Sequence, residues 1–324
     1  MAYEIYVDDI DKDEMRSGFL VTTDRKKLWN VELNLIVEFA RICKKHDLRW
    51  FVSGGTLLGA ARHGGFIPWD DDVDLAMMRP DYEKFKSVAP SELKPEFFLD
   101  IWHNYVREGE PNPNNYQVIK REHLQKYPWL PFSPFLKIRD PRTTFVKYPE
   151  VDNLMQSIWL DVFPFDPVPP FDNPEHEKIF RAGEELRVAA TYPEQIIKEL
   201  ELKREFINRD LLEEVVRKPF HERAVVYENY LATNYFESKY CCGITFNSLP
   251  LDSPNHVPPY TRYYYREAAY LPFERLTVPL PIDYVKVLRN RYGVDWMTPR
   301  RTHTHAKIFS TDVSYKDYFA QRED

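Results

Sequence analysis

The most informative part of the chain reads SGGTLLGAARHGGFIPWDDDVD and spans residues 53–74. It ends in an acidic run, and we predict a strand from Asp70 to Met77. Because alternate side chains of a strand share a face, Asp70, Asp72 and Asp74 would point the same way. Carboxylates gathered on one face repel one another unless a cation neutralises them. Hard divalent ions take oxygen ligands, so the pattern predicts a site for Mg²⁺ or Mn²⁺.

Three other interpretations of the acidic run were weighed. A calcium loop starting at Asp70 would need glycine at its sixth position and glutamate at its twelfth, where the chain has Leu75 and Asp81. That interpretation is rejected. A run of charged residues usually forms a solvated turn, but here the residues on both sides of the run are apolar. The tripeptide Asp72-Val73-Asp74 also matches the Asp-x-Asp motif of nucleotide-sugar glycosyltransferases, a short signal that stays open as an alternative.

A glycine turn precedes the acidic run. Gly54-Gly55 follows a predicted strand, Leu48 to Val52, and opens a short predicted helix, Thr56 to Arg62, which the His63-Gly64-Gly65 sequence ends. Glycine lets the backbone approach a ligand closely, and the N–H groups at a helix start attract phosphate. The turn and the acidic run together predict a phosphate cradle beside a metal platform, the parts that phosphoryl transfer needs.

A further carboxylate lies alone in an apolar segment. Asp161 interrupts the sequence IWLDVF, residues 158–163, which we interpret as a buried strand. An ionised carboxylate inside such a strand is costly without a partner. We therefore expect Asp161 to face the metal site rather than solvent at a sheet edge.

The composition is that of a folded protein with no general affinity for nucleic acid. The chain has 324 residues, 15% of them aromatic, and a formal net charge of −7. Nucleic-acid binding requires clustered Lys and Arg, so we expect no nucleic-acid partner. No apolar run is long enough to span a bilayer, and no signal peptide is evident, which predicts a cytoplasmic protein. Cys43, Cys241 and Cys242 are too few for a disulfide framework and are expected to be buried thiols, although a zinc site with His256 was considered.

The remaining pattern predicts an ordered series of elements. Residues 24–46 form an amphipathic helix with Thr23 as its N-cap. Residues 103–118 are a polar loop. A proline cluster at 164–174 is the best candidate boundary. The other expected elements are strands at 135–139 and 144–147 joined by a turn, helices over 174–236, and a helix near 282–292.

The quoted stretch resembles the signature of the LicD family, which includes bacterial phosphocholine transferases and resembles fukutin-type sugar phosphotransferases. Later segments also look like this family, in the family's order. They are FLKIRD at 135–140, WLDVFPFD at 159–166, VPLP at 278–281 and YGVDWM at 292–297. The resemblance covers most of residues 25–305.

The resemblance implies an α+β fold with a polymerase-β-like nucleotidyltransferase core, a small mixed sheet flanked by helices. The implied organisation is a catalytic core at 1–168, a helical region at 169–240 and a C-terminal segment at 241–324 that packs back on the core. The site residues carried over are metal ligands and catalytic acids (Asp72, Asp74 and Asp161), a further ligand (Asp70), and donor-phosphate contacts (Gly54, Gly55, Thr56, Arg62, Lys137 and Arg139).

The reaction implied by the resemblance moves a substituted phosphate, such as phosphocholine, from a CDP-linked donor to a sugar hydroxyl. CDP-choline or a related molecule would be the donor. The acceptor would be a sugar or a lipid-linked glycan, a precursor of a cell-surface glycan such as lipopolysaccharide or teichoic acid. Such a protein would meet the inner face of the membrane peripherally. The donor head group, the acceptor sugar and the role of residues 174–236 are left open by the sequence.

Overall fold

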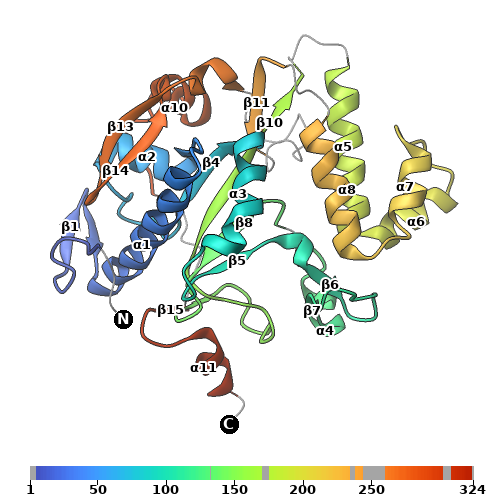
Figure 1. Cartoon of the computed structure of the whole chain (residues 1–324), viewed down its shortest axis with the longest axis horizontal. Coiled ribbons are helices and arrows are strands. Elements are labelled where there is room, and N and C mark those ends of the chain that lie inside the picture. The colour runs from blue at the N-terminus through green and yellow to red at the C-terminus, as the bar shows by residue number, and fades with distance from the viewer. Residues whose placement is uncertain are drawn as a thin grey trace. The chain divides into compact units, whose positions relative to one another are not determined.

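The computed structural model describes the chain in six stretches and divides it into two compact units. The first unit comprises residues 1–100, 136–163 and 263–324, and the second comprises residues 101–135 and 164–262. Each unit is described by itself below, with the elements labelled as in Figure 1. The described residues are 5–131, 133–169, 175–233, 238–243, 260–301 and 308–322.

The first unit is built on a sheet with the long strand β10 inside it. β10 spans Trp159–Val168 and contributes its first half to this unit. On one side it pairs antiparallel with β8, Leu136–Arg139, which pairs in turn with β5, Phe98–Asp100. On the other side lie β4, Asp74–Met78, and then β3, Phe51–Val52. The apolar run of β4 is buried, so this strand lies in the core of the unit.

Helix α1, Thr23–Lys45, confirms the predicted amphipathic helix to within one residue at each end. Its N-cap is Thr22 rather than Thr23, because the Thr22 hydroxyl accepts the Arg25 N–H. Lys44 and Lys45 lie in the last turn, where a positive charge suits the helix dipole.

Helix α2, Gly54–His63, begins two residues earlier than predicted because the glycine turn is itself its first turn. It ends at Gly64, whose φ of 66° is the left-handed conformation expected of a glycine stop. Helix α3, Arg79–Glu92, follows β4 directly. The stretch 48–92 therefore folds as strand, helix, strand and helix in succession (Figure 1).

The rest of the first unit consists of short strand pairs and helices. The strands predicted at 135–139 and 144–147 do form, and both β8 and β9 have partners distant in sequence: β9 pairs with β15 near the C-terminus. The further elements are β1 (Glu14–Arg16), β2 (Phe19–Val21), β9 (Thr144–Val146), β13 (Ala268–Phe273), β14 (Leu276–Pro281), α10 (Tyr284–Tyr292), β15 (Ile308–Ser310) and α11 (Tyr315–Ala320).

The second unit is mainly helical, as the pattern over 174–236 predicted. Helices α5 and α8 lie side by side (Figure 1), and the ring of Trp102 meets Phe220 and Tyr227 edge-on in the core of the unit. The helices are α4 (Arg121–Lys126), α5 (His176–Thr191), α6 (Pro193–Glu201), α7 (Arg209–Val215) and α8 (Phe220–Thr233). The other elements are η1 (Trp102–Asn104), β6 (Tyr105–Arg107), β7 (Gln117–Ile119), β11 (Tyr240–Gly243) and β12 (Tyr260–Thr261), with η2 (Arg262–Tyr265) at its end.

Two predictions about this unit were wrong in part. The polar stretch 103–118 is not all loop, because its ends carry β6 and β7, which pair in parallel. Strand β10 was expected to end near Phe163, yet it continues through Pro164 and Pro167 to Val168 and pairs with β11. Proline lacks an N–H but its fixed φ is compatible with an extended strand, so pairing with β11 overrides the local signal.

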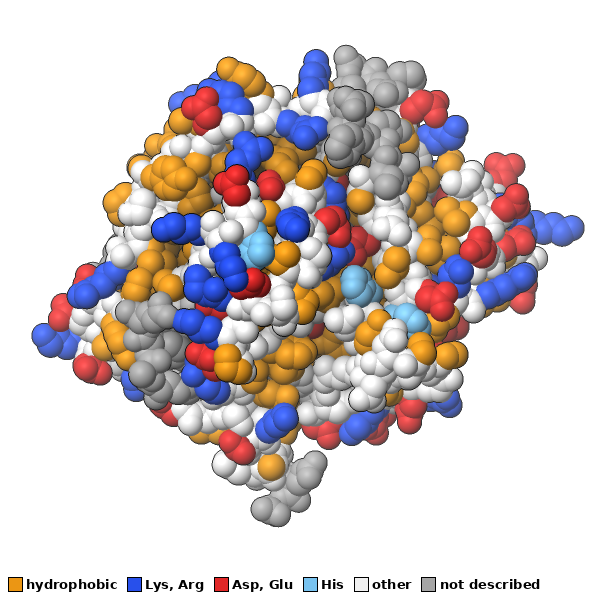
Figure 2. Space-filling model, in the orientation of Figure 1, with side chains coloured by type: hydrophobic (Ala, Val, Ile, Leu, Met, Phe, Trp, Pro, Cys, Tyr) orange, Lys and Arg blue, Asp and Glu red, His pale blue; other side chains and the backbone are white. Residues whose placement is uncertain are grey.

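Lys and Arg side chains are interspersed with Asp and Glu on the face shown in Figure 2, and neither sign forms a continuous patch there. None of the helices among the described residues is both long enough and apolar enough to cross a bilayer. Cys43 and Cys241 are buried free thiols, whereas the side chain of Cys242 and the whole of His256 lie outside the described residues.

Candidate metal and phosphate site

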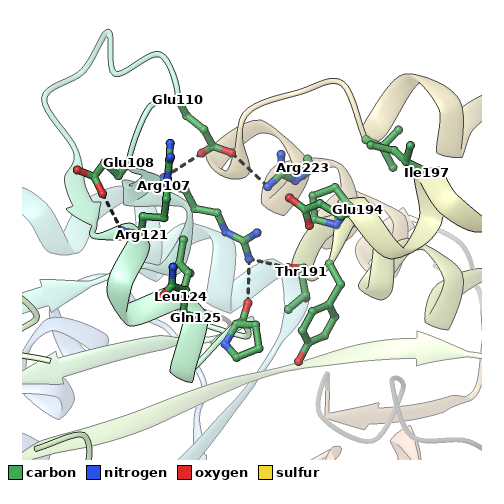
Figure 3. Close-up of a pocket in the computed structure, with 14 residues that line it drawn as sticks. Arg107, Glu108, Glu110, Arg121, Leu124, Gln125, Thr191, Glu194, Ile197 and Arg223 are labelled. Carbon is green, nitrogen blue, oxygen red and sulfur yellow. Dashed lines mark hydrogen bonds and ion pairs between the residues drawn. The ribbon is translucent and has the colours of Figure 1, made fainter. Parts of the chain in front are cut away.

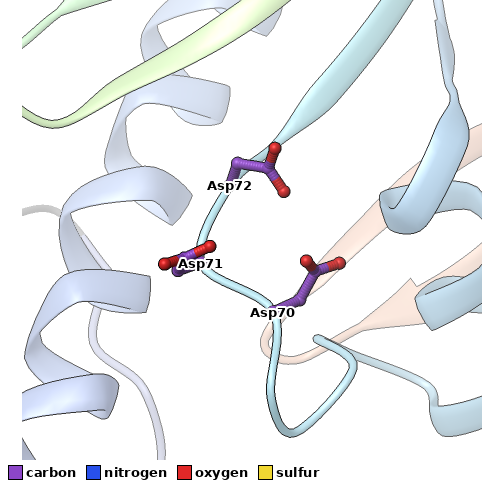
Figure 4. Close-up of side chains that lie close together, drawn as sticks. All are labelled: Asp70, Asp71 and Asp72. Carbon is purple, nitrogen blue, oxygen red and sulfur yellow. The ribbon is translucent and has the colours of Figure 1, made fainter. Parts of the chain in front are cut away.

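Three consecutive aspartates come together on a bend before β4. Asp70, Asp71 and Asp72 each place a carboxylate oxygen within 4.8 Å of the others (Figure 4). The predicted strand over 70–77 was wrong at its start, because β4 begins only at Asp74. Its partner β3 pairs only with Leu75 and Ala76, so β3 does not extend the strand to the residues before Asp74. The bend lets Asp71, which strict alternation pointed away, join the cluster.

The glycine turn packs directly against these acids. Gly54 has a φ of +52°, and a side chain there would overlap the carboxylate of Asp74. A Cβ on Gly55 would lie 2.5 Å from Oδ2 of Asp70, which is also too close. Only glycine fits at either position without displacing a carboxylate. The turn and the acidic residues are therefore adjacent in space.

Backbone hydrogen bonds hold the turn and the strand in register. The Ser53 N–H donates to the carbonyl of Asp74 over 2.9 Å. The Asp74 N–H donates to the hydroxyl oxygen of Thr56 over 2.8 Å. Thr56 was predicted to contact donor phosphate, and its observed contact links the first turn of α2 to the acidic strand. The two bonds fix the position of Asp74 relative to the N-terminus of α2.

Helix α1 supports the acidic bend from one face. Arg25 and Trp29 both donate to the carbonyl oxygen of Asp70, over 2.7 Å from Nη1 and 3.0 Å from Nε1. The Trp29 ring stacks on Phe66 with their centroids 4.8 Å apart. Neither residue was singled out from the sequence. Their spacing of four residues, which places them on one helix face, is the only sequence signal that could have paired them.

Glu32 adds a fourth carboxyl group beside the bend. Its side chain is 1% exposed, and Oε2 has no hydrogen-bond partner in the described part of the chain. Burial raises the pKa of Glu32 well above its ordinary value, and the negative charges of Asp72, Asp71 and Asp70 raise it further. Glu32 was not predicted, because nothing in the sequence distinguishes it from the other polar residues of this amphipathic helix.

Asp161 lies in β10 beside the end of the acidic bend. Its backbone N–H donates to the carbonyl of Val73 over 2.8 Å, and its side chain is ion-paired with Lys137 of β8. The two residues face each other in the antiparallel register of β8 and β10. Burial lowers the pKa of Lys137, although the Asp161 charge opposes that shift. The buried carboxylate thus has the partner that its apolar surroundings require.

The other predicted phosphate contacts make structural bonds within the unit. Arg139 donates through Nε to Oδ2 of Asp100 over 2.6 Å. Arg62 donates through Nη1 to the carbonyl of Trp296 over 2.9 Å and through Nε to Nε2 of His63 over 3.0 Å. Burial, and then the charges of nearby arginines, lower the pKa of His63 to about 4, which keeps the ring neutral and able to accept that bond. A role of Arg62 and Arg139 toward phosphate stays a prediction.

The side chains present fit a divalent cation. Carboxylate oxygens are the ligands that Mg²⁺ and Mn²⁺ prefer, and those of Asp70, Asp71 and Asp72 converge at the bend. Of the predicted ligands, Asp70 and Asp72 belong to this group and Asp74 and Asp161 do not, whereas Asp71 was not predicted as a ligand. Oε2 of Glu32 is buried and accepts no hydrogen bond in the described part of the chain. Beside Glu32 the site therefore has more hydrogen-bond acceptors than donors. A cation would supply the missing positive charge.

Comparison with known proteins agrees with this arrangement. Residues 47–169 match the sequence model described as LicD/FKTN/FKRP, nucleotidyltransferase domain. This part of the chain is similar to the nucleotidyltransferase domain of that family. The matched range contains the glycine turn, the acidic bend and Asp161. It also contains the three basic residues predicted to contact phosphate, Arg62, Lys137 and Arg139.

Relatives of known activity share the same region. The chain is 30% identical over 138 residues to lipopolysaccharide cholinephosphotransferase LicD of Haemophilus influenzae, which covers 42% of each chain. It is 34% identical over 87 residues to the human ribitol 5-phosphate transferase FKRP. The aligned region covers 26% of this chain and 17% of the FKRP chain. The chain thus matches less than half the length of these relatives. Both are transferases by name.

Proposed function

We propose that this protein is a metal-dependent phosphotransferase of the LicD family. It would move a substituted phosphate, phosphocholine or a similar polyol phosphate, from a CDP-linked donor to a sugar hydroxyl of a cell-surface glycan precursor. The observation that carries the proposal is the contact between the glycine turn and the acids: Gly54 and Gly55 leave no room for a side chain beside Asp74 and Asp70. The backbone at the start of α2 therefore lies beside carboxylates suited to a cation.

The arrangement of elements supports a polymerase-β-like core. Helix α2 starts in the glycine turn, β4 follows with Asp74 at its first position, and β10 lies beside β4 with Asp161 next to Val73. Two acidic segments are thereby adjacent in one sheet, beside a helix N-terminus. This is the layout that the family resemblance implies for nucleotidyl and phosphoryl transfer.

The residues take distinct roles in this proposal. The backbone at Gly54, Gly55 and Thr56 would bind the donor phosphates, because N–H groups at a helix start attract anions. Asp72, Asp74 and Asp161 would hold Mg²⁺ or Mn²⁺, with Asp70 as a further ligand. When bound, that cation would neutralise charge developing on the transferred phosphate.

Asp161 is also the best placed group to accept a proton from the acceptor hydroxyl. Its carboxylate contacts Lys137 in an ion pair, and a carboxylate can serve as a general base. Lys137 would then orient Asp161 rather than bind phosphate by itself. In the same way the Arg25 and Trp29 bonds to the Asp70 carbonyl would keep the acidic bend in a fixed conformation.

The glycosyltransferase alternative receives less support. A nucleotide-binding βαβ half would have to precede the Asp-x-Asp motif. Among described residues 5–53, strands β1 and β2 pair with each other antiparallel, and α1 is the helix that follows. No parallel βαβ half is present in that described range.

The test is metal-dependent release of CMP by the purified chain. CDP-choline, CDP-ribitol and CDP-glycerol would each be incubated with Mn²⁺ and a sugar acceptor, and CMP would be quantified. We expect release with at least one donor, dependent on Mn²⁺ and lost in Asp72→Asn. Asp24→Asn removes an exposed carboxylate of α1 and serves as the matched control. Release of UDP or GDP from a nucleotide sugar, with no CMP from any CDP donor, would overturn the proposal.

A further inference from the structure

The second unit contains a cavity of about 530 Å³ that has no role in the proposed reaction. Strand β6 and helix α4 form one wall, and the start of α6 with α8 forms the other (Figure 3). Its volume lies in the range of sites for small molecules rather than single ions. We call it the arginine cavity, after Arg107, Arg121 and Arg223 in its lining.

One of these arginines is buried and another is half-buried. Arg223 is 3% exposed, and burial is the main cause that lowers its pKa. Burial also lowers the pKa of Arg107, and the charge of Arg223 lowers it further, so the two guanidinium groups repel each other. Arg223 pairs with Glu110 at 3.3 Å, whereas the Arg107 guanidinium has no ion pair among the described residues. The cavity lining therefore holds buried positive charge that is not fully compensated.

Two donor groups of the lining also lack acceptors. Nε of Arg107 and the hydroxyl of Thr191 are buried, and neither has a hydrogen-bond partner in the described part of the chain. They come from β6 and the end of α5, and Arg223 of α8, whose Nη2 pairs with Glu110, lies in the same lining. Buried donors without acceptors are uncommon and costly in a folded protein.

The carboxylates of the lining do not supply the missing acceptors. Glu110 accepts the backbone N–H groups of Arg107 and Phe220, each over 2.9 Å. Glu108 accepts the Arg121 N–H over 2.7 Å, and Glu194 is exposed to solvent. The guanidinium of Arg107 is held by the carbonyl oxygens of Thr191 and Pro128, 2.5 and 3.1 Å from Nη2, which fixes its position in the wall (Figure 3).

We infer that the arginine cavity binds an oxyanion carried on a sugar-sized molecule, held by Arg107, Arg223 and Thr191. A guanidinium group is suited to phosphate and carboxylate because its planar donors match their oxygens. The walls also present Pro193, Ile197 and Leu124, which offer apolar contact to a ring or carbon chain. The exposed Glu194 and Glu108 can accept bonds from ligand hydroxyls. The inference does not depend on the proposed phosphotransferase reaction.

The experiment measures ligand binding to the full chain by calorimetry in EDTA, which removes divalent cations from the acidic site. Ribose 5-phosphate and glucuronate are the probes, and ribose and inorganic phosphate are the controls that lack one half of the ligand. We expect saturable binding of a probe and at least about tenfold weaker binding of both controls. The preferred probe identifies whether phosphate or carboxylate is the oxyanion. Hydrogen exchange should show protection in 105–128 and 189–198.

Variants separate the cavity from other anion-binding surfaces. Thr191→Val keeps the shape of the side chain and the backbone carbonyl that Arg107 contacts. Because the variant loses one hydrogen bond to a charged ligand, binding should weaken about tenfold. Arg107→Gln should weaken it more. Arg121→Gln is the matched control, an exposed arginine of the same lining, and should change affinity less than about twofold. No saturable binding of either probe, or unchanged affinity in folded Thr191→Val and Arg107→Gln, would overturn the inference.

Discussion

The acidic site of the first unit and the arginine cavity of the second are opposite in charge and in the way they are assembled. Four aspartates and two glycines of the acidic site lie within residues 53–74, and their contacts are mostly local. The arginine cavity takes Arg107, Thr191 and Arg223 from segments that are far apart in the chain. A site encoded in one continuous stretch is recognisable from sequence, whereas a site assembled from distant elements is not.

The largest expected effect tests whether the two regions act independently. Asp72→Asn and Asp74→Asn should each lower CMP release by about 10²–10³-fold, because loss of a ligand charge removes several kcal/mol of transition-state stabilisation. Binding of an oxyanion in the arginine cavity should be unchanged. Kinetic assays and calorimetry on the same preparations measure both. Full turnover in both variants would show that the site assignment is wrong.

The next effect concerns the local packing of the acidic site. Gly54→Ala should destabilise the chain by about 2–4 kcal/mol, since alanine combines a left-handed backbone with overlap of the Asp74 carboxylate. Gly18→Ala is the matched control, because Gly18 has a φ of +72° but open space around it. It should cost only about 1–2 kcal/mol. Urea unfolding of both variants gives the comparison, and equal losses would contradict close packing at Gly54.

A smaller effect tests the long-range support of this otherwise local site. Trp29→Phe removes the indole N–H that donates to the Asp70 carbonyl and retains a ring for stacking on Phe66. Loss of one hydrogen bond of about 1 kcal/mol should weaken Mn²⁺ binding about fivefold. Trp50→Phe is the control, because Trp50 contacts Phe39, another aromatic residue of α1. Mn²⁺ titration followed by electron paramagnetic resonance measures the affinities. Equal affinities would mean that α1 does not order the bend.

The smallest effect concerns His63, at the end of the decisive stretch. Its pKa of about 4 lies below its ordinary value of 6.5, with burial as the main cause and Arg62 and Arg16 adding to it. As pH falls from 6.5 towards 4, the unfolded chain takes up a proton that the folded chain does not, so stability falls over that window. A nuclear magnetic resonance titration, with His63→Gln to assign the signal, should give a midpoint near 4. A midpoint near 6.5 would contradict burial of the ring.

The secondary structure of the first unit followed its sequence closely where local rules decide. The apolar period of α1, the glycine stop at Gly64 and the apolar run of β4 each gave an element at the predicted place. The errors lay where pairing decides. β3 pairs with β4 only from Leu75, although β10 already contacts the carbonyl of Val73, and β10 continues past Pro164 because β11 supplies a partner.

The candidate site shows the same division. Asp70, Asp72, Asp74, Gly54 and Gly55 were predicted from the sequence because their spacing carries a chemical meaning. Arg25, Trp29 and Glu32 were missed, since one helix face contacts the acidic bend only after α1 has packed there. The pairing of Lys137 with Asp161 required the register of two antiparallel strands, which neither segment specifies alone.

The sequence by itself determined that aspartates follow a glycine turn, a pattern from which we predict binding of phosphate and a divalent cation. It could do so because a turn that admits only glycine and a run of like charges are local constraints. The tertiary structure alone decided that Glu32 is buried beside the aspartates, and that Arg107, Thr191 and Arg223 share a cavity. Those facts depend on burial and on the meeting of distant segments, which no short stretch of chain encodes.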